Sequence, residues 1–227
     1  MPATIPETNP VLLLEFSTQR KSAAVWMEGR RCAALTTDDA ACDGHWPLLV
    51  RQVLANARVT ADRLRTVAVG LGPGSYAGIR TALAVAQGIC LPTALPLLGI
   101  NSAAAWANAW LHAEGGTAAT VIGDARRGYF WVGRFAAGAR PFHDARDFAL
   151  VKPEALPNAV DPQAVVLCPD AGRIGGRLQA LLPANRIALD APLPDADMLG
   201  QWLALHPEDA CTRPLPIYLF PPVRTGG

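Results

Sequence analysis

The stretch Val67–Gln87, VAVGLGPGSYAGIRTALAVAQ, predicts a strand, a glycine-rich turn and a helix in direct succession. Its first residues, Val67–Leu71, place valine and leucine at alternate positions, which favours a short buried strand. Gly72–Ser75 then predicts a tight turn, because proline fixes φ and glycine permits a positive φ. A helix is expected from Ala77, since the apolar residues that follow recur at helical spacing. They are Ile79, Ala82, Leu83, Ala86 and Ile89.

A turn of this kind can hold an anion at the helix N-terminus, or it can let another stretch of backbone come close. A Walker A loop would require Gly-Lys-Ser/Thr after the turn, and a dinucleotide fingerprint would require the spacing G-x-G-x-x-G. The segment has neither. Both alternatives stay open on the residues alone, with tight packing of strand, turn and helix slightly favoured.

The composition favours a folded chain with a large buried core. The 227 residues are 51% hydrophobic and 17% charged, which suits one domain or two small ones and is not typical of disorder. The net charge is +1, and no basic tract marks a stand-alone nucleic-acid binder. No apolar run is long enough to cross a bilayer, so we expect no membrane partner.

The cysteines are five in number and scattered, which argues against a disulfide framework and against a zinc site. They are Cys32, Cys42, Cys90, Cys168 and Cys211. The first ten residues, MPATIPETNP, lack the basic and apolar regions of a signal peptide. We therefore expect a cytoplasmic protein.

The first half is predicted to have the order β-β-β-α-β-α-β-α. Three strands are expected at Val11–Leu14, Ser22–Met27 and Arg31–Leu35, and an amphipathic helix at His45–Ala57. A short glycine-rich stretch, residues 114–116, is the expected boundary between two halves.

The second half begins again with a strand and a hairpin, so the two halves repeat one pattern. This repetition matches the two-lobed actin-like and sugar-kinase architecture. We expect an α/β protein with two actin-like, ribonuclease H-like lobes, each a mixed β-sheet flanked by helices. The expected lobes are residues 11–113 and 117–210, followed by an extended tail at 211–227.

Six segments together resemble the TsaB (YeaZ) family. They are Leu14–Thr18, Gly70–Arg80, Ala86–Gly88, Pro96–Ser102, Asp124–Arg127 and Tyr218–Leu219. The resemblance is strong from about Leu12 to Ala109, fair to Phe135 and weak afterwards. Its most diagnostic part is the long glycine segment, GLGPGSYAGIR at residues 70–80.

The resemblance implies an actin-like ATPase fold and a non-catalytic paralogue of TsaD, the subunit that transfers threonylcarbamoyl to tRNA. It implies a TsaD-like partner, a TsaE-like ATPase partner and a homodimer through the first lobe. Contact with tRNA would come only through the complex. No cofactor is expected in this chain, with ATP at most at a complex interface.

The chain departs from the family pattern at several positions, so it looks like a divergent member. Glu15-Phe16 stands where the family usually has Asp-Thr. Tyr129 and Trp131 stand where it usually has Glu and Tyr, and Phe220 replaces an arginine.

A vestigial nucleotide site is the candidate binding site, with Glu15, Ser17, Gly72, Gly74 and Asp124 as its residues. Glu15 and Asp124 could hold Mg²⁺ between the lobes, as in a small ATP-dependent phosphotransferase. Alternatively each carboxylate ends a strand and caps a turn, which is favoured because the glycine that lets a phosphate approach is absent. We expect no metal site and no catalytic residue.

The candidate partner interface lies on the helix from His45 and on the alanine-rich helix after the glycine turn. Its residues are His45, Leu49, Val53, Ala82, Ala86 and Ile89. Small side chains let two helices approach closely, and such a contact would explain the high apolar content. An accessory subunit is therefore the first hypothesis, and a phosphotransferase or peptidase of the same architecture is the alternative.

Overall fold

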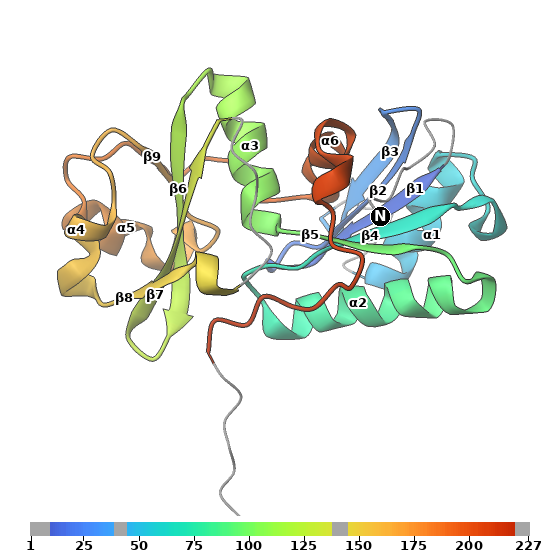
Figure 1. Cartoon of the computed structure of the whole chain (residues 1–227), viewed down its shortest axis with the longest axis horizontal. Coiled ribbons are helices and arrows are strands. Elements are labelled where there is room, and N and C mark those ends of the chain that lie inside the picture. The colour runs from blue at the N-terminus through green and yellow to red at the C-terminus, as the bar shows by residue number, and fades with distance from the viewer. Residues whose placement is uncertain (1–9, 39–44, 138–144, 221–227) are drawn as a thin grey trace, which may run out of the picture.

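The computed structural model describes residues 10–38, 45–137 and 145–220, which form two lobes side by side (Figure 1). Each lobe contains a five-stranded mixed β-sheet with helices packed against it. The expected α/β class with two sheet-and-helix lobes is thus confirmed. Among the described residues, no helix combines the length and the apolar character needed to cross a membrane.

The first sheet has the strand order β3-β2-β1-β4-β5. Its strands are β1 Val11–Glu15, β2 Ser22–Met27, β3 Arg30–Thr36, β4 Thr66–Gly70 and β5 Leu97–Ile100. The first three form an antiparallel meander, while β4 and β5 run parallel to β1. Glu28 and Gly29 join β2 to β3, both at positive φ, as expected of a two-residue hairpin turn.

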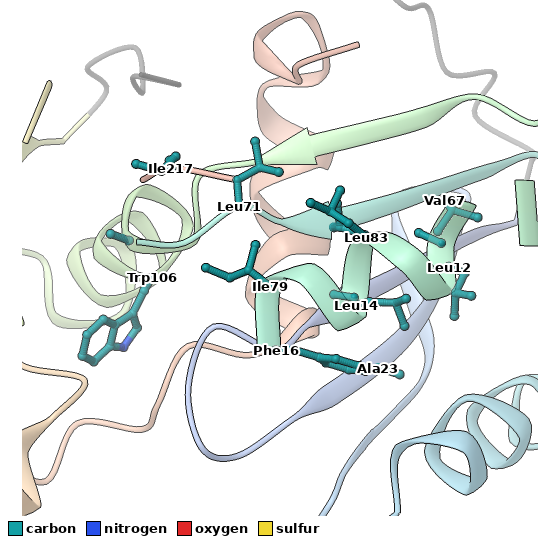
Figure 2. Close-up of a cluster of buried hydrophobic side chains, with 14 of the residues drawn as sticks. Leu12, Leu14, Phe16, Ala23, Val67, Leu71, Ile79, Leu83, Trp106 and Ile217 are labelled. Carbon is teal, nitrogen blue, oxygen red and sulfur yellow. The ribbon is translucent and has the colours of Figure 1, made fainter. Parts of the chain in front are cut away.

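Helices cover both faces of this sheet (Figure 1). They are α1 Trp46–Asn56, α2 Tyr76–Cys90, α3 Ser102–Glu114 and α6 Ala196–Leu205. Leu12 and Leu14 of β1 share one buried cluster with α1 and α2, whereas Leu13 points into another with α3 and α6. Period-two alternation along a strand buried on both faces produces this division. Figure 2 shows the α2 side, with Leu14 and Phe16 beside Ile79.

The second sheet has the order β10-β9-β6-β7-β8. Its strands are β6 Ala118–Arg126, β7 Tyr129–Ala136, β8 Ala149–Val151, β9 Val165–Leu167 and β10 Ile187–Ala188. Two helices belong to this lobe, α4 Leu156–Ala159 and α5 Ala171–Leu181. Read from β8, the order repeats that of the first sheet: three antiparallel strands, then two strands that run parallel to the third. The repeated pattern read from the residues is therefore a repeated topology.

Strand β8 lies at the edge of this sheet and pairs antiparallel with β7. Residues 138–144 lie outside the described part of the chain, as do residues 39–44, where Cys42 falls. The described part of the chain begins at Pro10.

Helix α6 lies within the range expected for the second lobe, residues 117–210, but it packs on the first sheet. Trp202, on α6, is buried with Leu13 in the cluster on that face. The Trp26 Nε1–H donates a hydrogen bond to Asp197 Oδ1 over 3.0 Å. The chain therefore returns to the first lobe after building the second.

Residues 211–220 form an extended tail that runs along the first lobe (Figure 1). Cys211 exchanges two backbone hydrogen bonds with Gly99 of β5, at 2.8 and 2.9 Å. Further on, the Ile217 N–H donates to the Leu71 carbonyl over 2.9 Å, and the Ile217 side chain is buried. The tail thus covers the chain segments around the end of β4.

Candidate functional site

The glycine turn between β4 and α2 holds another backbone segment of this chain. A Cβ at Gly74 would lie 2.2 Å from the Ser17 carbonyl oxygen, and a Cβ at Gly78 would lie 2.0 Å from that of Phe16. The Ser75 N–H donates to the Ser17 carbonyl over 2.6 Å. Of the two alternatives for this turn, close approach of backbone is the one that the geometry supports.

The first turn of α2 is capped from within the chain. Ser75 is the N-cap residue, and its Oγ accepts a hydrogen bond from the Gly78 N–H over 3.2 Å. Ser102 Oγ accepts from the Gly72 N–H over 3.0 Å. Two N–H groups at the start of α2, those of Ser75 and Gly78, are thus satisfied within the chain and are not free to bind an anion.

Glu15, the last residue of β1, is completely buried. Its Oε1 accepts a hydrogen bond from the Ser17 N–H over 2.6 Å, while Oε2 lies over Gly70 on the side of Ser102. Loss of solvation raises the pKa of Glu15 above its ordinary 4.5, and Ser102 and Ser17 offset only part of that rise. The side chain is folded into the core, so this carboxyl group has no solvent-facing oxygen to offer a ligand.

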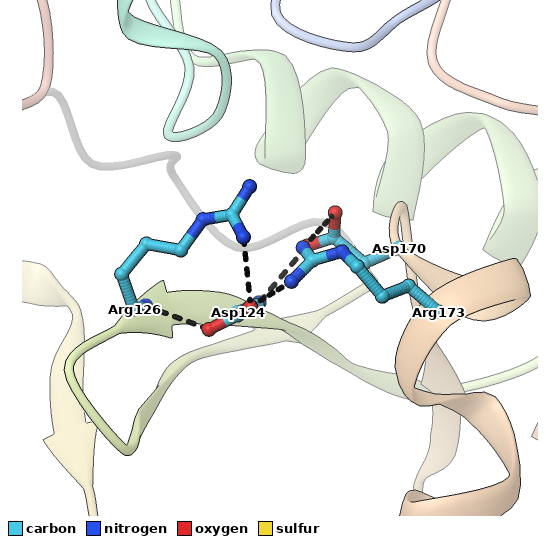
Figure 3. A network of polar contacts seen from close by, with 4 residues as sticks. All are labelled: Asp124, Arg126, Asp170 and Arg173. Atoms are coloured by element: carbon cyan, nitrogen blue, oxygen red, sulfur yellow. Dashed lines mark hydrogen bonds and ion pairs between the residues drawn. The ribbon is translucent and has the colours of Figure 1, made fainter.

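Asp124 lies in the second lobe, near the end of β6, within a network of charged groups (Figure 3). Arg173, on α5, forms an ion pair with Asp124 and a second one with Asp170 at 2.8 Å. Arg126 donates its backbone N–H to Asp124 Oδ1 over 2.6 Å. Burial raises the pKa of Asp170, and Arg126 offsets part of this. A guanidinium thus occupies the position between two carboxylates that a metal ion would need.

The five residues of the expected nucleotide site are therefore used in two separate places. Glu15, Ser17, Gly72 and Gly74 lie around the glycine turn of the first lobe, where their contacts are internal. Asp124 lies in the second lobe and is neutralised by arginines.

One group of possible metal ligands was not singled out from the sequence. Among the described residues, His206, Glu208 and Asp209 bring their ligand atoms within 4.8 Å of one another. They follow α6 directly, and their spacing in the chain, H-x-E-D, is the signal that could have found them.

The expected partner interface needs a correction. Leu49, Val53, Ala82 and Ala86 are all completely buried inside this chain, in the cluster between the first sheet and its helices. Ile89 is partly buried against the same cluster. Only His45 is exposed. The reason is visible in the spacing: Ala82 and Ala86 share a helical face with the core residues Ile79 and Leu83.

The face of α2 that points away from the sheet is a different one. Its exposed residues are Tyr76, Ala77, Arg80, Ala84, Gln87 and Gly88, with Leu91 directly after the helix. Tyr76 is 57% exposed and Leu91 is 84% exposed. Small side chains between two large apolar ones are an arrangement that allows a second helix to approach closely.

Two lobes with one repeated topology, three antiparallel strands followed by two parallel ones, define an actin-like, ribonuclease H-like α/β protein. Two structures from Pseudomonas aeruginosa share this fold. One is a protein with similarity to peptidase YEAZ, which aligns over 94% of this chain and 100% of its own with a TM-score of 0.71 and 23% identity. The other is YeaZ, with 92% and 100% coverage, a TM-score of 0.70 and 22% identity.

The family model described as "TsaD: tRNA N6-adenosine threonylcarbamoyltransferase" matches residues 45–168, which is more than half of the chain. The chain belongs to this family. The tRNA threonylcarbamoyladenosine biosynthesis protein TsaB of Escherichia coli (strain K12) is 26% identical over 147 residues. That alignment covers 64% of this chain and 64% of the E. coli protein. Within the family, the resemblance to the TsaB (YeaZ) group is thus confirmed.

Proposed function

We propose that this chain is an accessory subunit that binds a TsaD-like catalytic subunit. In that complex it supports transfer of a threonylcarbamoyl group to the adenosine next to the anticodon of tRNAs. A TsaE-like ATPase would join the complex, tRNA would be bound through it, and the free chain would form a homodimer. The observation that carries this proposal is the glycine turn, whose Gly74 and Gly78 pack against the chain's own backbone at Ser17 and Phe16.

A role without catalysis is supported by the state of both candidate carboxylates. Glu15 is buried and hydrogen-bonded to the Ser17 N–H, and Asp124 is paired with Arg173. A phosphotransferase would need such groups free to hold Mg²⁺ and phosphate. In this chain the strand, turn and helix of the family fold serve as scaffold.

The outward face of α2 is the surface that we propose for the partner. It exposes Ala77, Ala84 and Gly88, so a partner helix could lie close to the α2 backbone, with Tyr76 and Leu91 at its two ends. A homodimer would use the same face, which makes the two assemblies alternatives.

The test is co-purification with the TsaD-like protein of the same organism. Ala84→Glu places a charge in the middle of the proposed face, and we expect it to abolish both the complex and the homodimer while the monomer stays folded. Ala180→Glu is the matched control, because Ala180 is an exposed alanine on α5 of the other lobe. A complex that survives Ala84→Glu would refute the assigned face. No complex with the wild-type chain, and no loss of the modified nucleoside on deletion, would refute the function.

Titration with ATP and Mg²⁺ separates this proposal from the phosphotransferase alternative. We expect no binding by the isolated chain. Micromolar binding that is lost in Glu15→Ala would favour the enzyme instead.

A further inference from the structure

The tail places two aromatic side chains between the lobes. Its Tyr218 ring lies 5.2 Å, centroid to centroid, from Tyr76 at the start of α2 in the first lobe. Its Phe220 ring lies 6.3 Å from Tyr129 at the start of β7 in the second lobe. One extended segment thus joins an aromatic pair on each lobe into a single surface.

An arginine lies against each pair. The Arg80 guanidinium lies 5.1 Å from the centroid of the Tyr76 ring and donates a hydrogen bond to the Tyr76 hydroxyl. The Arg127 guanidinium lies 5.2 Å from the centroid of the Phe220 ring. Both arginines are exposed, and neither takes part in the ion pairs found between described residues.

The β6–β7 turn holds its arginines in an uncommon backbone conformation. Arg126 and Arg127 have φ values of 65° and 54°. Positive φ is a region that few residues other than glycine, asparagine and aspartate adopt. Arg126 is paired with Asp124, whereas Arg127 extends over Phe220. The turn thus places Arg127 beside the tail, where its guanidinium lies over the Phe220 ring.

We propose that this surface, made of Tyr76, Arg80, Arg127, Tyr129, Tyr218 and Phe220, contacts an RNA segment with unpaired bases. A guanidinium that lies against a ring keeps N–H groups free to bind phosphate oxygens. Tyrosine and phenylalanine rings offer apolar contact to bases that are not stacked in a helix. The net charge of the whole chain is only +1. Two arginines that have no carboxylate partner among the described residues, beside four aromatic rings, therefore form a local site.

RNA fits this chemistry better than an acidic protein segment does, because one RNA strand supplies both phosphates and flat bases. The surface also begins at Tyr76, the first residue of the helix proposed as the partner face. An RNA segment held here would lie at the edge of the proposed complex. The identification of that RNA as a tRNA rests on the proposed function. The chemistry of the surface does not depend on it.

The test measures binding of a fluorescently labelled, unmodified tRNA transcript, by anisotropy at several salt concentrations. Arg127→Ala should weaken binding and lower the slope of log affinity against log salt by about 1. Tyr218→Ala should weaken binding by at least about fivefold, whereas Tyr218→Phe keeps the ring and should bind like the wild type. Arg63→Ala, an exposed arginine before β4 at the other end of that strand, is the matched control and should bind like the wild type. A fully paired RNA duplex should bind more weakly than the transcript.

Wild-type affinity in both Arg127→Ala and Tyr218→Ala would overturn the inference, and so would absence of transcript binding by the wild-type chain and its complex. If these variants lose the TsaD-like subunit but keep the transcript, the surface is a protein interface and the inference also falls. Failure of the proposed function is recognised separately, because it appears as absence of the TsaD-like complex in co-purification, a measurement that does not depend on transcript binding.

Discussion

At the scale of single residues, Glu15 shows how a family position can change its role. The carboxylate ends β1, where it receives the Ser17 N–H, and its second oxygen lies over Gly70 next to Ser102. Gly70 is required there, because a Cβ would lie 1.9 Å from Glu15 Oε2. The longer side chain is thus accommodated inward, and the residue serves the core.

The stability of the protein should depend on the protonation of Glu15. Its native pKa is raised above 4.5, so the native state holds the proton more tightly than the unfolded chain. This contribution is fully present below pH 4.5 and is lost as pH rises towards the native pKa, at about 1.4 kcal/mol per pH unit. Glu15→Gln carries no such proton. We therefore expect its free energy of unfolding, measured with urea, to rise relative to wild type between pH 5 and pH 7.

Glu154→Gln, at an exposed position, is the control and should follow the wild type across that range. If the free energy of unfolding changes equally with pH in Glu15→Gln and in the wild type, Glu15 does not titrate between pH 5 and pH 7.

At the scale of elements, α2 has three different environments along one helix. Its N-terminus meets the loop after β1, its apolar face packs on the first sheet, and its small-residue face points outward. Gly78 and Gly88 represent two of these environments. A Cβ at Gly78 would lie 2.0 Å from the Phe16 carbonyl, whereas nothing lies within 4 Å of one at Gly88.

Alanine at these two glycines should have opposite effects on stability. Gly78→Ala should destabilise the protein by about 1–3 kcal/mol or more, because backbone must move to admit the methyl group. Gly88→Ala should stabilise the monomer by up to about 1 kcal/mol through helix propensity alone. Urea unfolding of both variants provides the measurement. Equal effects would mean that the loop after β1 does not pack on α2.

At the scale of the whole molecule, the last segments of the chain complete the first lobe. Helix α6 covers one face of the first sheet, and the tail hydrogen-bonds to Gly99 and Leu71. Ile217 of the tail is 4% exposed, whereas Leu215, two residues earlier, is 74% exposed. The first lobe is therefore complete only when the C-terminal part of the chain is in place.

Truncation of the tail's buried anchor should lower the stability of the whole protein. Ile217→Ala should cost about 2–5 kcal/mol, because it removes a buried branched side chain and leaves a cavity beside Leu71. Leu215→Ala truncates a side chain of similar size that is exposed to solvent, so it should have little effect on stability. Thermal unfolding of both variants decides the matter: a Tm unchanged by Ile217→Ala would mean that the tail is not part of the folded unit.

Much of this fold could be predicted because its signals are local. Alternating valines and leucines and the glycine segment predicted the strands and the helix of the first lobe where the structure has them. The same local signals could not show which surface covers each apolar helix face. They gave α1 and α2 an apolar face, but Leu49 and Ala82 were assigned to a partner protein while the chain's own sheet covers them.

The sequence by itself determined the elements, their order, the duplicated α/β pattern and the TsaB-like family, since periodicity and turn chemistry depend on neighbouring residues. Only the tertiary structure decided that α6 and Ile217 return to the first lobe, and that Phe16 and Ser17 pack against the glycine turn. It also decided that Arg173 neutralises Asp124. The physical reason is that these contacts join residues far apart in the chain, and their formation depends on which buried faces and charges the folded backbone brings together.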